Sequence, residues 1–580
     1  MVILGIWDGH DAGAALLVDG RPAAAVNEER LSRRKLDMRF PAASIASCLS
    51  IAGVAPRDVA IVAASTTDPA KTLGRLMPWT KERYYAVRRR KARPGWLAGA
   101  TQFIKQRMTE WPPSAPTAAL SRHLLRRDLA RSGLAHADLQ LFDHHHCHAR
   151  TAAHASGFDA CVVVTIDGLG DGRSSTVSVF RDGRLEVVAA STARDSLGVF
   201  FEHVTRLLNM RELEDEGKVM ALADYAAPIA DAQNPLLDLF TVDRGSIRAR
   251  VPGHALTRVL KRWHWSMANE QFAFVAQRTV ERVCCDLVTS AIAATGLRRV
   301  ALAGGVVSNI KANRLIRLLP DVEDVFVFPH MGDGGLALGA ALAAADSDRI
   351  AGPFDALALG PEFGPDAIDV ALRRAGLQAS RADDLAGDVT DRIVAGQVVC
   401  WFQGRMEYGP RALGYRSVLA RPDRPDLKDR LNLILKRRVW YQPFCPSVLE
   451  GEAPRLFSDW TPAGRRNRAM TMAYLVHADF RQALAGVTSI DGSCRPQLVA
   501  ESGAEPLAPV LRRLRSRLGV GAVLNTSFNI HGEPLVCTPA DAIDVFQRCG
   551  ADALAIGPYV IERPDLAPEH RTRHAVVAST

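Results

Sequence analysis

Two stretches of the sequence repeat one order of strands and turns, and this repeat constrains the fold more than any other feature. Residues 2–30 contain the apolar runs VILGI and AALLV, separated by the turn DGHDAG and followed by Asp19-Gly20-Arg21 and a returning segment. Residues 161–191 show the same order, with CVVVTI, Asp167-Gly168, STVSVF, Asp182-Gly183-Arg184 and LEVVAAS. Asp-Gly pairs between apolar runs predict β-hairpins. The repeat therefore predicts two related α/β lobes, each presenting an acidic turn to a cleft between them.

A duplicated α/β chain of this kind resembles the actin-like ATPase superfamily, in which phosphates lie between paired hairpins. The later part of the first half fits this plan. Residues 271–295 have the apolar spacing of an amphipathic helix. A strand, RRVALAGG, then ends at Gly304-Gly305, and a second strand, DVFVFP, runs into the glycine turn HMGDGG, which is expected to open a helix.

The chain is expected to divide at residues 345–365, a segment rich in Gly, Pro and Asp. Beyond this linker, residues 366–560 have strands and helices of their own. We therefore predict a first domain over residues 1–352, a second α/β domain over 353–563 and a flexible tail over 564–580.

The composition of the 580-residue chain is that of a globular protein. Hydrophobic residues make up 48% and charged residues 23%, which excludes disordered and fibrous classes for the bulk of the chain. No apolar run reaches the length of a membrane span, and the N-terminus lacks the features of a signal peptide. Ten cysteines without a CxxC pair do not form a disulfide scaffold, so we expect a cytoplasmic protein that is not membrane-bound.

The net charge of +9, from 72 Lys+Arg against 63 Asp+Glu, invites a nucleic-acid partner. The arginines are scattered, however, and the dense run is Arg88, Arg89, Arg90, Lys91 and Arg93. A solvated helix face is the expected role of this run, with a docking patch for an acidic partner as the alternative. We expect no nucleic-acid partner.

A histidine cluster, Asp143-His144-His145-His146-Cys147-His148, is the most specific single motif. In a helix, His144 and His148 lie on one face, where both can bind one divalent metal ion. The third ligand must come from elsewhere, and Asp333 in the glycine turn is the candidate. The alternative is a solvated group of histidines.

Other candidates lie in the predicted turns of the first half. His10, in the first acidic turn, is placed to act as a general base toward a hydroxyl, or is simply a hydrogen-bonded turn residue. The turns at Glu216-Gly217-Lys218 and at Gly304-Gly305 with Asn309 would let the backbone approach a nucleotide closely.

The second half contains the densest set of cations, set among glycines rather than along a helix face. Such positions suit the binding of phosphate or carboxylate, with structural salt bridges as the alternative. The set comprises Arg405, Arg411, Arg416, Lys436, Arg437, Arg438 and Arg495, together with the polar loop from Asn525 to Asn529.

These residues resemble the O-carbamoyltransferases of the nodulation-factor, cephamycin and tobramycin type, which are related to the hydrogenase-maturation carbamoyltransferase. The resemblance covers roughly residues 1–563. It rests on the His-Asp turn at 10–11, EERLSRRK at 28–35, HHHCHA at 144–149, SLGVFFEHVT at 196–205, EGKVMALA at 216–223, AGGVVSN at 303–309, WFQGRMEYGPRALG at 401–414, PSVL at 446–449 and LNTSFNIHGEPLVCTP at 524–539.

The resemblance implies a Kae1-like, actin-like domain followed by a YrdC-like domain. It implies that carbamoyl phosphate and ATP give carbamoyl-adenylate and pyrophosphate in the second domain. The first domain would then transfer the carbamoyl group to an acceptor hydroxyl and release AMP. A small-molecule acceptor, such as a natural product or sugar, and a homodimer are what the family suggests.

The same resemblance implies roles for individual residues. His144, His148 and Asp333 match metal ligands, His10 matches the base, and Lys35 matches an active-site lysine that meets the adenylate. The two-histidine, one-carboxylate set suits Fe2+, with Zn2+ or Mn2+ as alternatives, and Mg2+ is a possible companion of ATP. Asp167, Gly168, Lys218, Gly304, Gly305 and Asn309 are the candidate nucleotide-binding residues. Arg411, Arg416, Lys436, Arg495, Asn525, Ser527 and Asn529 would bind carbamoyl phosphate or ATP.

The chain departs from the family pattern at three places. Gln442 stands where relatives often have Arg, so one phosphate contact is absent or has moved to Arg437 or Arg438. HHHCH replaces the HHLAH common in relatives, and residues 206–215 lack the glycine-rich text found before EGK. That segment lies near the acceptor in the family, which leaves the acceptor open. A tRNA threonylcarbamoylation enzyme and a scaffold without catalysis are the alternative functions.

Overall fold

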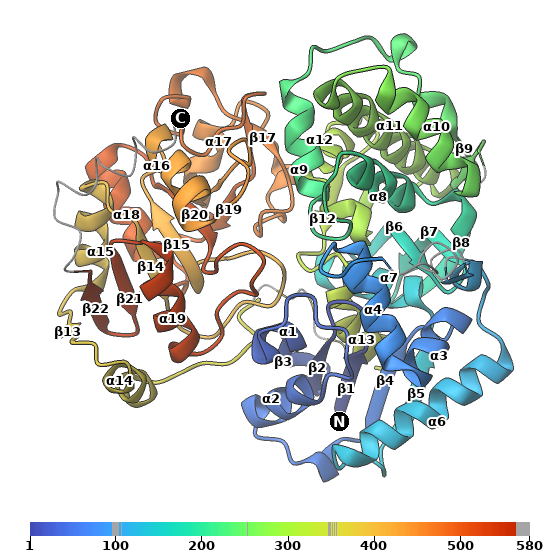
Figure 1. The fold of residues 1–580 in the computed structure, drawn as a ribbon, viewed down its shortest axis with the longest axis horizontal. Coiled ribbons are helices and arrows are strands. Elements are labelled where there is room, and N and C mark those ends of the chain that lie inside the picture. The colour runs from blue at the N-terminus through green and yellow to red at the C-terminus, as the bar shows by residue number, and fades with distance from the viewer. Residues whose placement is uncertain are drawn as a thin grey trace.

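Two halves with separate sheets make up the protein (Figure 1). The computed structural model describes residues 1–94, 104–105, 107–251, 253–345, 350, 352, 354 and 357–563, without the side chains of residues 253 and 254. The first half, blue to green, occupies the right of Figure 1, and the second half, yellow to red, occupies the left. The predicted tail and part of the predicted linker lie outside the described residues.

The first sheet has five strands in the order β3-β2-β1-β4-β5. Its strands are β1 (Val2–Trp7), β2 (Gly13–Val18), β3 (Arg21–Asn27), β4 (Ile61–Ser65) and β5 (Asp138–Phe142). Strands β1, β2 and β3 form an antiparallel meander, whereas β1, β4 and β5 are parallel.

The second sheet repeats this topology, in the order β8-β7-β6-β11-β12. Its strands are β6 (Ala160–Gly170), β7 (Arg173–Arg181), β8 (Arg184–Thr192), β11 (Arg299–Ala303) and β12 (Asp324–Val327). The meander β6-β7-β8 is antiparallel, and β6, β11 and β12 are parallel. The internal duplication predicted from the repeat is therefore confirmed.

The Asp-Gly turns explain why both meanders form. Asp19 and Gly20 have φ angles of 48° and 77°, and Asp182 and Gly183 have 51° and 73°. Two consecutive left-handed residues make the hairpin turn whose twist matches the flanking strands. Both predicted hairpin turns are thus observed.

Two helices pack against each other between the two repeats and position the site. Helix α13 (Leu336–Ala344) packs against α7 (His144–Ser156) and against β1 and β4. The contacts are close: a Cβ on Gly339 would lie 2.2 Å from the carbonyl oxygen of Cys147, and one on Gly5 would lie 1.8 Å from that of Ala337. Glycine at these positions lets the backbones approach. The histidines that begin α7 are consequently brought toward the turn that precedes α13.

Helices cover the two sheets of the first half. The predicted amphipathic helix is α11 (Asn269–Thr295), which buries one face among apolar side chains. The other helices of the first half are α1 (Glu28–Ser32), α2 (Ala42–Ala52), α3 (Pro69–Leu76), α4 (Pro78–Arg88), α6 (Ala115–Arg131), α8 (Leu197–Leu207), α9 (Glu216–Leu222), α10 (Gly253–Trp265) and α12 (Ile310–Arg317). None of the helices in the described ranges is both long and apolar enough to cross a membrane.

The second half is a mixed α/β unit built on an eight-stranded sheet in the order β13-β22-β21-β14-β15-β20-β16-β19. Its strands are β13 (Ser380–Arg381), β14 (Val399–Phe402), β15 (Arg416–Ala420), β16 (Cys445–Leu449), β19 (Gln497–Val499), β20 (Ala522–Ser527), β21 (Ala553–Ile556) and β22 (Tyr559–Glu562). The helices include α14 (Pro365–Arg374), α15 (Leu385–Val394), α16 (Pro425–Arg430), α17 (Ala453–Leu456), α18 (Ala508–Leu518) and α19 (Pro539–Cys549). Helices α15 and α18 pack on each other, as do α14 and α19.

Arginine side chains join the halves through backbone carbonyls. Arg33 of the first half donates to the carbonyls of Pro534 and Leu535 in the second half. Arg405 of the second half donates to the carbonyl of Ala23 in the first half. Buried bonds of a charged donor are stronger than those between neutral groups. They fix the second half against the first sheet.

Candidate functional site

A cavity of about 370 Å³ is lined by both repeats of the first half and by a loop of the second. The first repeat contributes His10, from the turn after the central strand β1, and the second contributes Asp167, from the last part of the central strand β6. Asp333 comes from the turn before α13, and Arg411 comes from the second half. The cavity therefore lies where the predicted acidic turns and the predicted cationic loop meet.

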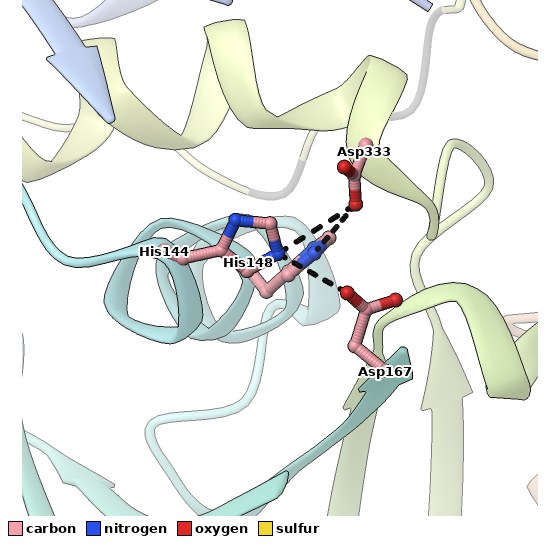
Figure 2. A group of neighbouring side chains, drawn as sticks. All are labelled: His144, His148, Asp167 and Asp333. Atoms are coloured by element: carbon pink, nitrogen blue, oxygen red, sulfur yellow. Dashed lines mark hydrogen bonds and ion pairs between the residues drawn. The ribbon is translucent and has the colours of Figure 1, made fainter. Parts of the chain in front are cut away.

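Two histidines and two carboxylates form a cluster (Figure 2), and its two carboxylates, Asp167 and Asp333, line the cavity. One ligand atom from each of His144, His148, Asp167 and Asp333 lies within 4.8 Å of the others. His144 Nε2 is 3.1 Å from Asp167 Oδ2 and 3.6 Å from Asp333 Oδ1, and His148 Nε2 is also 3.6 Å from Asp333 Oδ1. The predicted trio is thus brought together, and Asp167 is added to it.

Local sequence places the histidines on one face. Asp143 caps α7 by accepting from the backbone N–H of His146, so the helix starts at His144. His144 and His148 are then one turn apart, with ring centroids 4.8 Å from each other. Asp171 accepts from the backbone N–H of His144 at 2.8 Å and holds the helix start against β6.

The electrostatics of the cluster suit a cation. Burial alone would lower the pKa of His144, but the neighbouring Asp333 and Asp167 raise it to about 9. His148 Nε2 is buried and makes no hydrogen bond within the described chain. Two imidazole nitrogens and two carboxylate oxygens converging on one point are a donor set that fits a divalent metal ion.

Thr66 contacts the ring nitrogen of His144 that does not face the carboxylates. Its hydroxyl lies 3.0 Å from His144 Nδ1, which leaves Nε2 directed at the carboxylates. Thr66 is buried and has a φ of 69°, which is unusual for a β-branched residue. Partners on the far ring nitrogen commonly fix the orientation of a metal-binding histidine, and strained backbone often occurs at functional sites.

His10 faces the same cluster from the first repeat. Its Nδ1 lies 3.4 Å from Asp333 Oδ2, and its ring lies 5.7 Å from that of Tyr85. Burial lowers the pKa of His10, against the opposing effect of Asp333 and Asp167. A neutral imidazole at a cavity wall is the form that accepts a proton from a hydroxyl.

The wall farther along the cavity is mainly aromatic and acidic. Tyr84 and Tyr85 come from α4, Phe201 comes from α8, and Glu216 opens α9. Burial and the nearby Glu202 raise the pKa of Glu216 to about 8, so this carboxyl is largely protonated at neutral pH. Apolar faces with a few hydrogen-bonding groups are typical of sites for small organic molecules.

The basic run that ends α4 is only partly the solvated face predicted from the sequence, because Arg90, Lys91 and Arg93 are exposed whereas Arg88 and Arg89 are not. Arg88 is partly buried and donates to Glu202 and Glu212, each at 2.6 Å. Arg89 is buried and pairs with Glu214. These two arginines therefore bind acidic residues of their own chain, because segment 206–215 folds over the end of α4. Glu212 and Leu213 of that segment line the cavity.

Some of the predicted nucleotide-binding residues line the cavity, and the others do not. Gly168, Gly305 and Asn309 line the cavity beside Asp167. Gly304 has a φ of 103°, and the backbone N–H of Gly305 donates to Asp167 Oδ1 at 2.6 Å, so this turn orients a cluster carboxylate.

Two predicted lysines are held at the side of the cavity. The Lys218 side chain pairs with Asp215 at 2.7 Å, and its neighbour Gly217 is the one that lines the cavity. Similarly, Lys35 donates to Glu29 at 3.2 Å, whereas its neighbour Leu36 forms part of the wall.

Three arginines of the second half gather around the thiol of Cys445. Arg495 donates to the sulfur at 3.2 and 3.1 Å, and its charge, together with burial, lowers the pKa of Arg411 to about 9. Burial lowers the pKa of Arg438, beside the same residues, to about 9. Like charges held this close without a carboxylate favour an anion. Arg438 supplies a cation near Gln442, whose side-chain Oε1 is buried without a hydrogen bond.

Of the remaining predicted anion-binding residues, Lys436, Ser527 and Asn529 form one group. Lys436 Nζ donates to Asn529 Oδ1 at 2.9 Å and to Ser527 Oγ at 3.2 Å, and burial lowers its pKa to about 7. Asn525 is instead a buried structural residue, which donates to Ser447 Oγ at 2.8 Å and to the carbonyl of Ala412 at 3.2 Å.

Arg416 is a correction to the sequence-based assignment. Its side chain is fully buried, with the guanidinium 3.7 Å over the ring of Phe402. It donates to the backbone carbonyls of Gln403 and Pro361. These bonds engage both terminal nitrogens of its guanidinium with the backbone around the loop ahead of β15, whereas Arg411 and Arg495 lie beside Cys445.

The comparisons with known proteins identify the family of the chain. The chain matches the family described as Carbamoyltransferase N-terminus over residues 2–342 and that described as Carbamoyltransferase C-terminus over residues 390–563. The protein therefore belongs to the carbamoyltransferases, enzymes that transfer a carbamoyl group.

Relatives match along most of the chain. It is 33% identical to nodulation protein NolNO of Sinorhizobium fredii, over 98% of this chain and 81% of that one. It is also 33% identical to nodulation protein NolO of Bradyrhizobium diazoefficiens, over 73% of this chain and 79% of that one. Among solved structures, component A of (R)-2-hydroxyglutaryl-CoA dehydratase from Acidaminococcus fermentans matches with a TM-score of 0.34 and 16% identity, over 59% of this chain and 97% of that one.

Proposed function

We propose that this carbamoyltransferase activates its carbamoyl group with ATP and transfers it to a hydroxyl of a small molecule, such as a natural product or sugar. In the first reaction, water cleaves carbamoyl phosphate to carbamate and phosphate. A carbamate oxygen then bonds to the α-phosphorus of ATP, and the bond to pyrophosphate breaks, which gives carbamoyl-adenylate. In the second, the acceptor oxygen bonds to the carbamoyl carbon, the bond to AMP breaks, and the hydroxyl proton leaves to a base. AMP and an O-carbamate are the products.

The observation that carries this proposal is that Arg411 lines one cavity with Asp167 and Asp333, the two carboxylates of the histidine–carboxylate cluster. A carbamoyl group is a weak electrophile, and activation as a mixed anhydride provides a good leaving group. Such an anhydride hydrolyses in water, so a route enclosed between the two halves would protect it. In this reading the first half is a Kae1-like domain and the second a YrdC-like domain.

Each part of the cavity has a task in the proposed sequence. Arg411, Arg438 and Arg495 bind the phosphates of carbamoyl phosphate or ATP, and Lys436 extends this group. His10 accepts the proton of the acceptor hydroxyl, while Tyr84 and Tyr85 form the wall against which the acceptor lies. Asp167, Gly168 and Gly305 meet the adenylate in the turns between the repeats.

The histidine–carboxylate cluster would hold a divalent metal ion, for which we propose Fe2+, with Zn2+ or Mn2+ as alternatives. When bound, the ion supplies positive charge that stabilises the phosphate oxygens of the leaving AMP. Mg2+ would accompany ATP. The acceptor contributes only a hydroxyl, and the proposal requires neither a nucleic acid nor a membrane. A homodimer is compatible with it.

Exchange of labelled pyrophosphate into ATP tests the first reaction. With the full-length protein, carbamoyl phosphate, Mg2+ and a cluster metal, we expect exchange that depends on carbamoyl phosphate. Arg411→Ala should abolish it, whereas Arg374→Ala, an exposed residue of α14, should not. Absence of exchange under all these conditions would overturn the ATP-dependent mechanism. A screen of hydroxyl compounds for products that gain one carbamoyl group then identifies the acceptor.

A further inference from the structure

Tyr408 belongs to the second half of the chain, but its side chain lies in the core of the first half. It is only 2% exposed and packs with a cluster of buried residues that includes Trp7, Leu336 and Ala337. Its ring meets that of His330 edge to face, with centroids 4.6 Å apart. The loop that follows β14 within the WFQGRMEYGPRALG motif therefore places the side chain of Tyr408 against α13, the helix that follows the Asp333 turn.

The phenol of Tyr408 makes a specific polar contact with the turn that carries Asp333. Its hydroxyl donates to the carbonyl oxygen of Gly334 at 2.6 Å. Gly334 directly follows Asp333, whose carboxylate faces His144, His148 and His10. The turn has little spare room, since a Cβ on Gly334 would lie 2.3 Å from Asp11 Oδ2 and from the ring of His330. This bond consequently fixes the peptide that carries the cluster carboxylate.

The backbone that follows Tyr408 continues to Arg411, a member of the arginine group. The backbone N–H of Tyr408 donates to the carbonyl of Leu357 at 2.7 Å, and Arg30 donates to the carbonyl of Gly409 at 2.9 Å. Arg411, two residues beyond Gly409, enters the cavity. Tyr408 and Gly409 are thus both hydrogen-bonded to the first half, with the Asp333 turn on one side and Arg411 two residues farther along the chain.

We propose that Tyr408 is a positioning residue, whose hydroxyl holds the Asp333 turn in the geometry that the histidine–carboxylate cluster needs to bind its cation. The ring of Tyr408 packs in the core, whereas its hydroxyl bonds to the turn of the cluster. A substitution that removes only the hydroxyl therefore tests the second role alone. The inference rests on the proposed metal-dependent transfer. It goes beyond that function by assigning to the second half a direct part in building the metal centre of the first.

Tyr408→Phe is the test, because it keeps the ring and removes only the donor to Gly334. Affinity for Fe2+, and for Zn2+ or Mn2+ as substitutes, is measured on the full-length protein by competition with a chelator. We expect the variant to bind the cation about tenfold more weakly, as is usual when a group supporting a metal ligand is lost. Tyr415→Phe, at the residue that directly follows the motif, is the matched control and should bind as the wild type does.

Two activity measurements distinguish positioning from a general loss of structure. In Tyr408→Phe, carbamoyl transfer should fall at limiting metal and recover at saturating metal, while pyrophosphate exchange stays within twofold of the wild type. Equal metal affinities in the wild type and Tyr408→Phe would overturn this inference and leave the proposed function standing. Failure of the wild type to bind any of these ions would overturn both the metal site and the role of Tyr408, whereas loss of pyrophosphate exchange in the wild type counts against the ATP-dependent step alone.

Discussion

His10 Nδ1 and Asp333 Oδ2 lie 3.4 Å apart, although 323 positions separate them in the sequence. His10 stands in the turn after the first strand, and Asp333 stands in the turn before α13, which packs on that same strand. One carboxylate thus faces the candidate base on one side and the two cluster histidines on the other. Base, cluster and acceptor are consequently confined to one small space.

His10→Ala should abolish carbamoyl transfer and leave pyrophosphate exchange intact. The imidazole is placed to take the acceptor proton, and loss of a general base typically costs 10²–10⁴-fold in rate. Both reactions are measured on the same preparation, with exchange serving as the control for folding. If exchange were lost as well, His10 would have a structural role instead.

His148→Ala should remove the cation from the cluster. The substitution deletes an imidazole whose Nε2 is buried without a hydrogen bond, and we expect affinity to fall by at least about 100-fold, beyond the usual effect of a supporting residue. Metal content after dialysis and titration with Fe2+ provide the measurement. His146→Ala is a matched control on the same helix, because the His146 side chain contacts Phe142 and Arg150 instead of the cluster. Full transfer activity in a metal-free His144→Ala protein would contradict the assignment.

Arg88→Ala should raise the KM for the acceptor without changing pyrophosphate exchange. Removing the guanidinium leaves Glu202 and Glu212 without their shared partner, and breaking a buried ion pair typically costs about 3–5 kcal/mol. Segment 206–215 would then separate from α4, and the cavity wall would lose its shape. The unfolding midpoint should fall as well. Arg93→Ala, at an exposed position of the same run, is the control and should alter neither quantity.

Inorganic phosphate should raise the thermal unfolding midpoint of the protein. Arg411, Arg438 and Arg495 are close together, and an anion relieves their repulsion. Binding to the native state alone stabilises by about 2.7 kcal/mol when phosphate is present at 100 times its Kd.

Arg495→Ala provides the matched variant for the phosphate measurement. It should lose most of the shift, and without phosphate it should unfold no earlier than the wild type, because Arg495 is the main cause of the lowered pKa of Arg411. A phosphate shift of wild-type size in this variant would exclude the arginine group as the binding site.

The sequence predicted those parts of the fold and site that depend on nearby residues. Asp19-Gly20 and Asp182-Gly183 determine their hairpins through their own backbone angles. His144 and His148 share a face because the helix period is a local property. Asp333 was placed correctly beside them because a glycine turn before a helix marked it.

Features that depend on distant partners could not be predicted in this way. Arg88 is bound by acids 114 and 124 residues away, so its run looked like an exposed face. Arg416 had the sequence context of an anion ligand, but its donors bind the backbone of its own loop. Asp167 was assigned to a nucleotide, and its place in the cluster follows from how α7 packs on β6.

The location of Tyr408 has a consequence for how the protein is made. The ring of Tyr408 fills a position in the core of the first half, next to residues such as Trp7 and Leu336. During synthesis, domains generally fold from the N-terminus as the chain emerges. Here the first half cannot complete its own interior until the ribosome has translated some sixty residues beyond the end of α13 at Ala344. A nascent chain released before that point would expose an unfilled core, so the earliest intermediate that can assemble the histidine–carboxylate cluster already contains part of the second half.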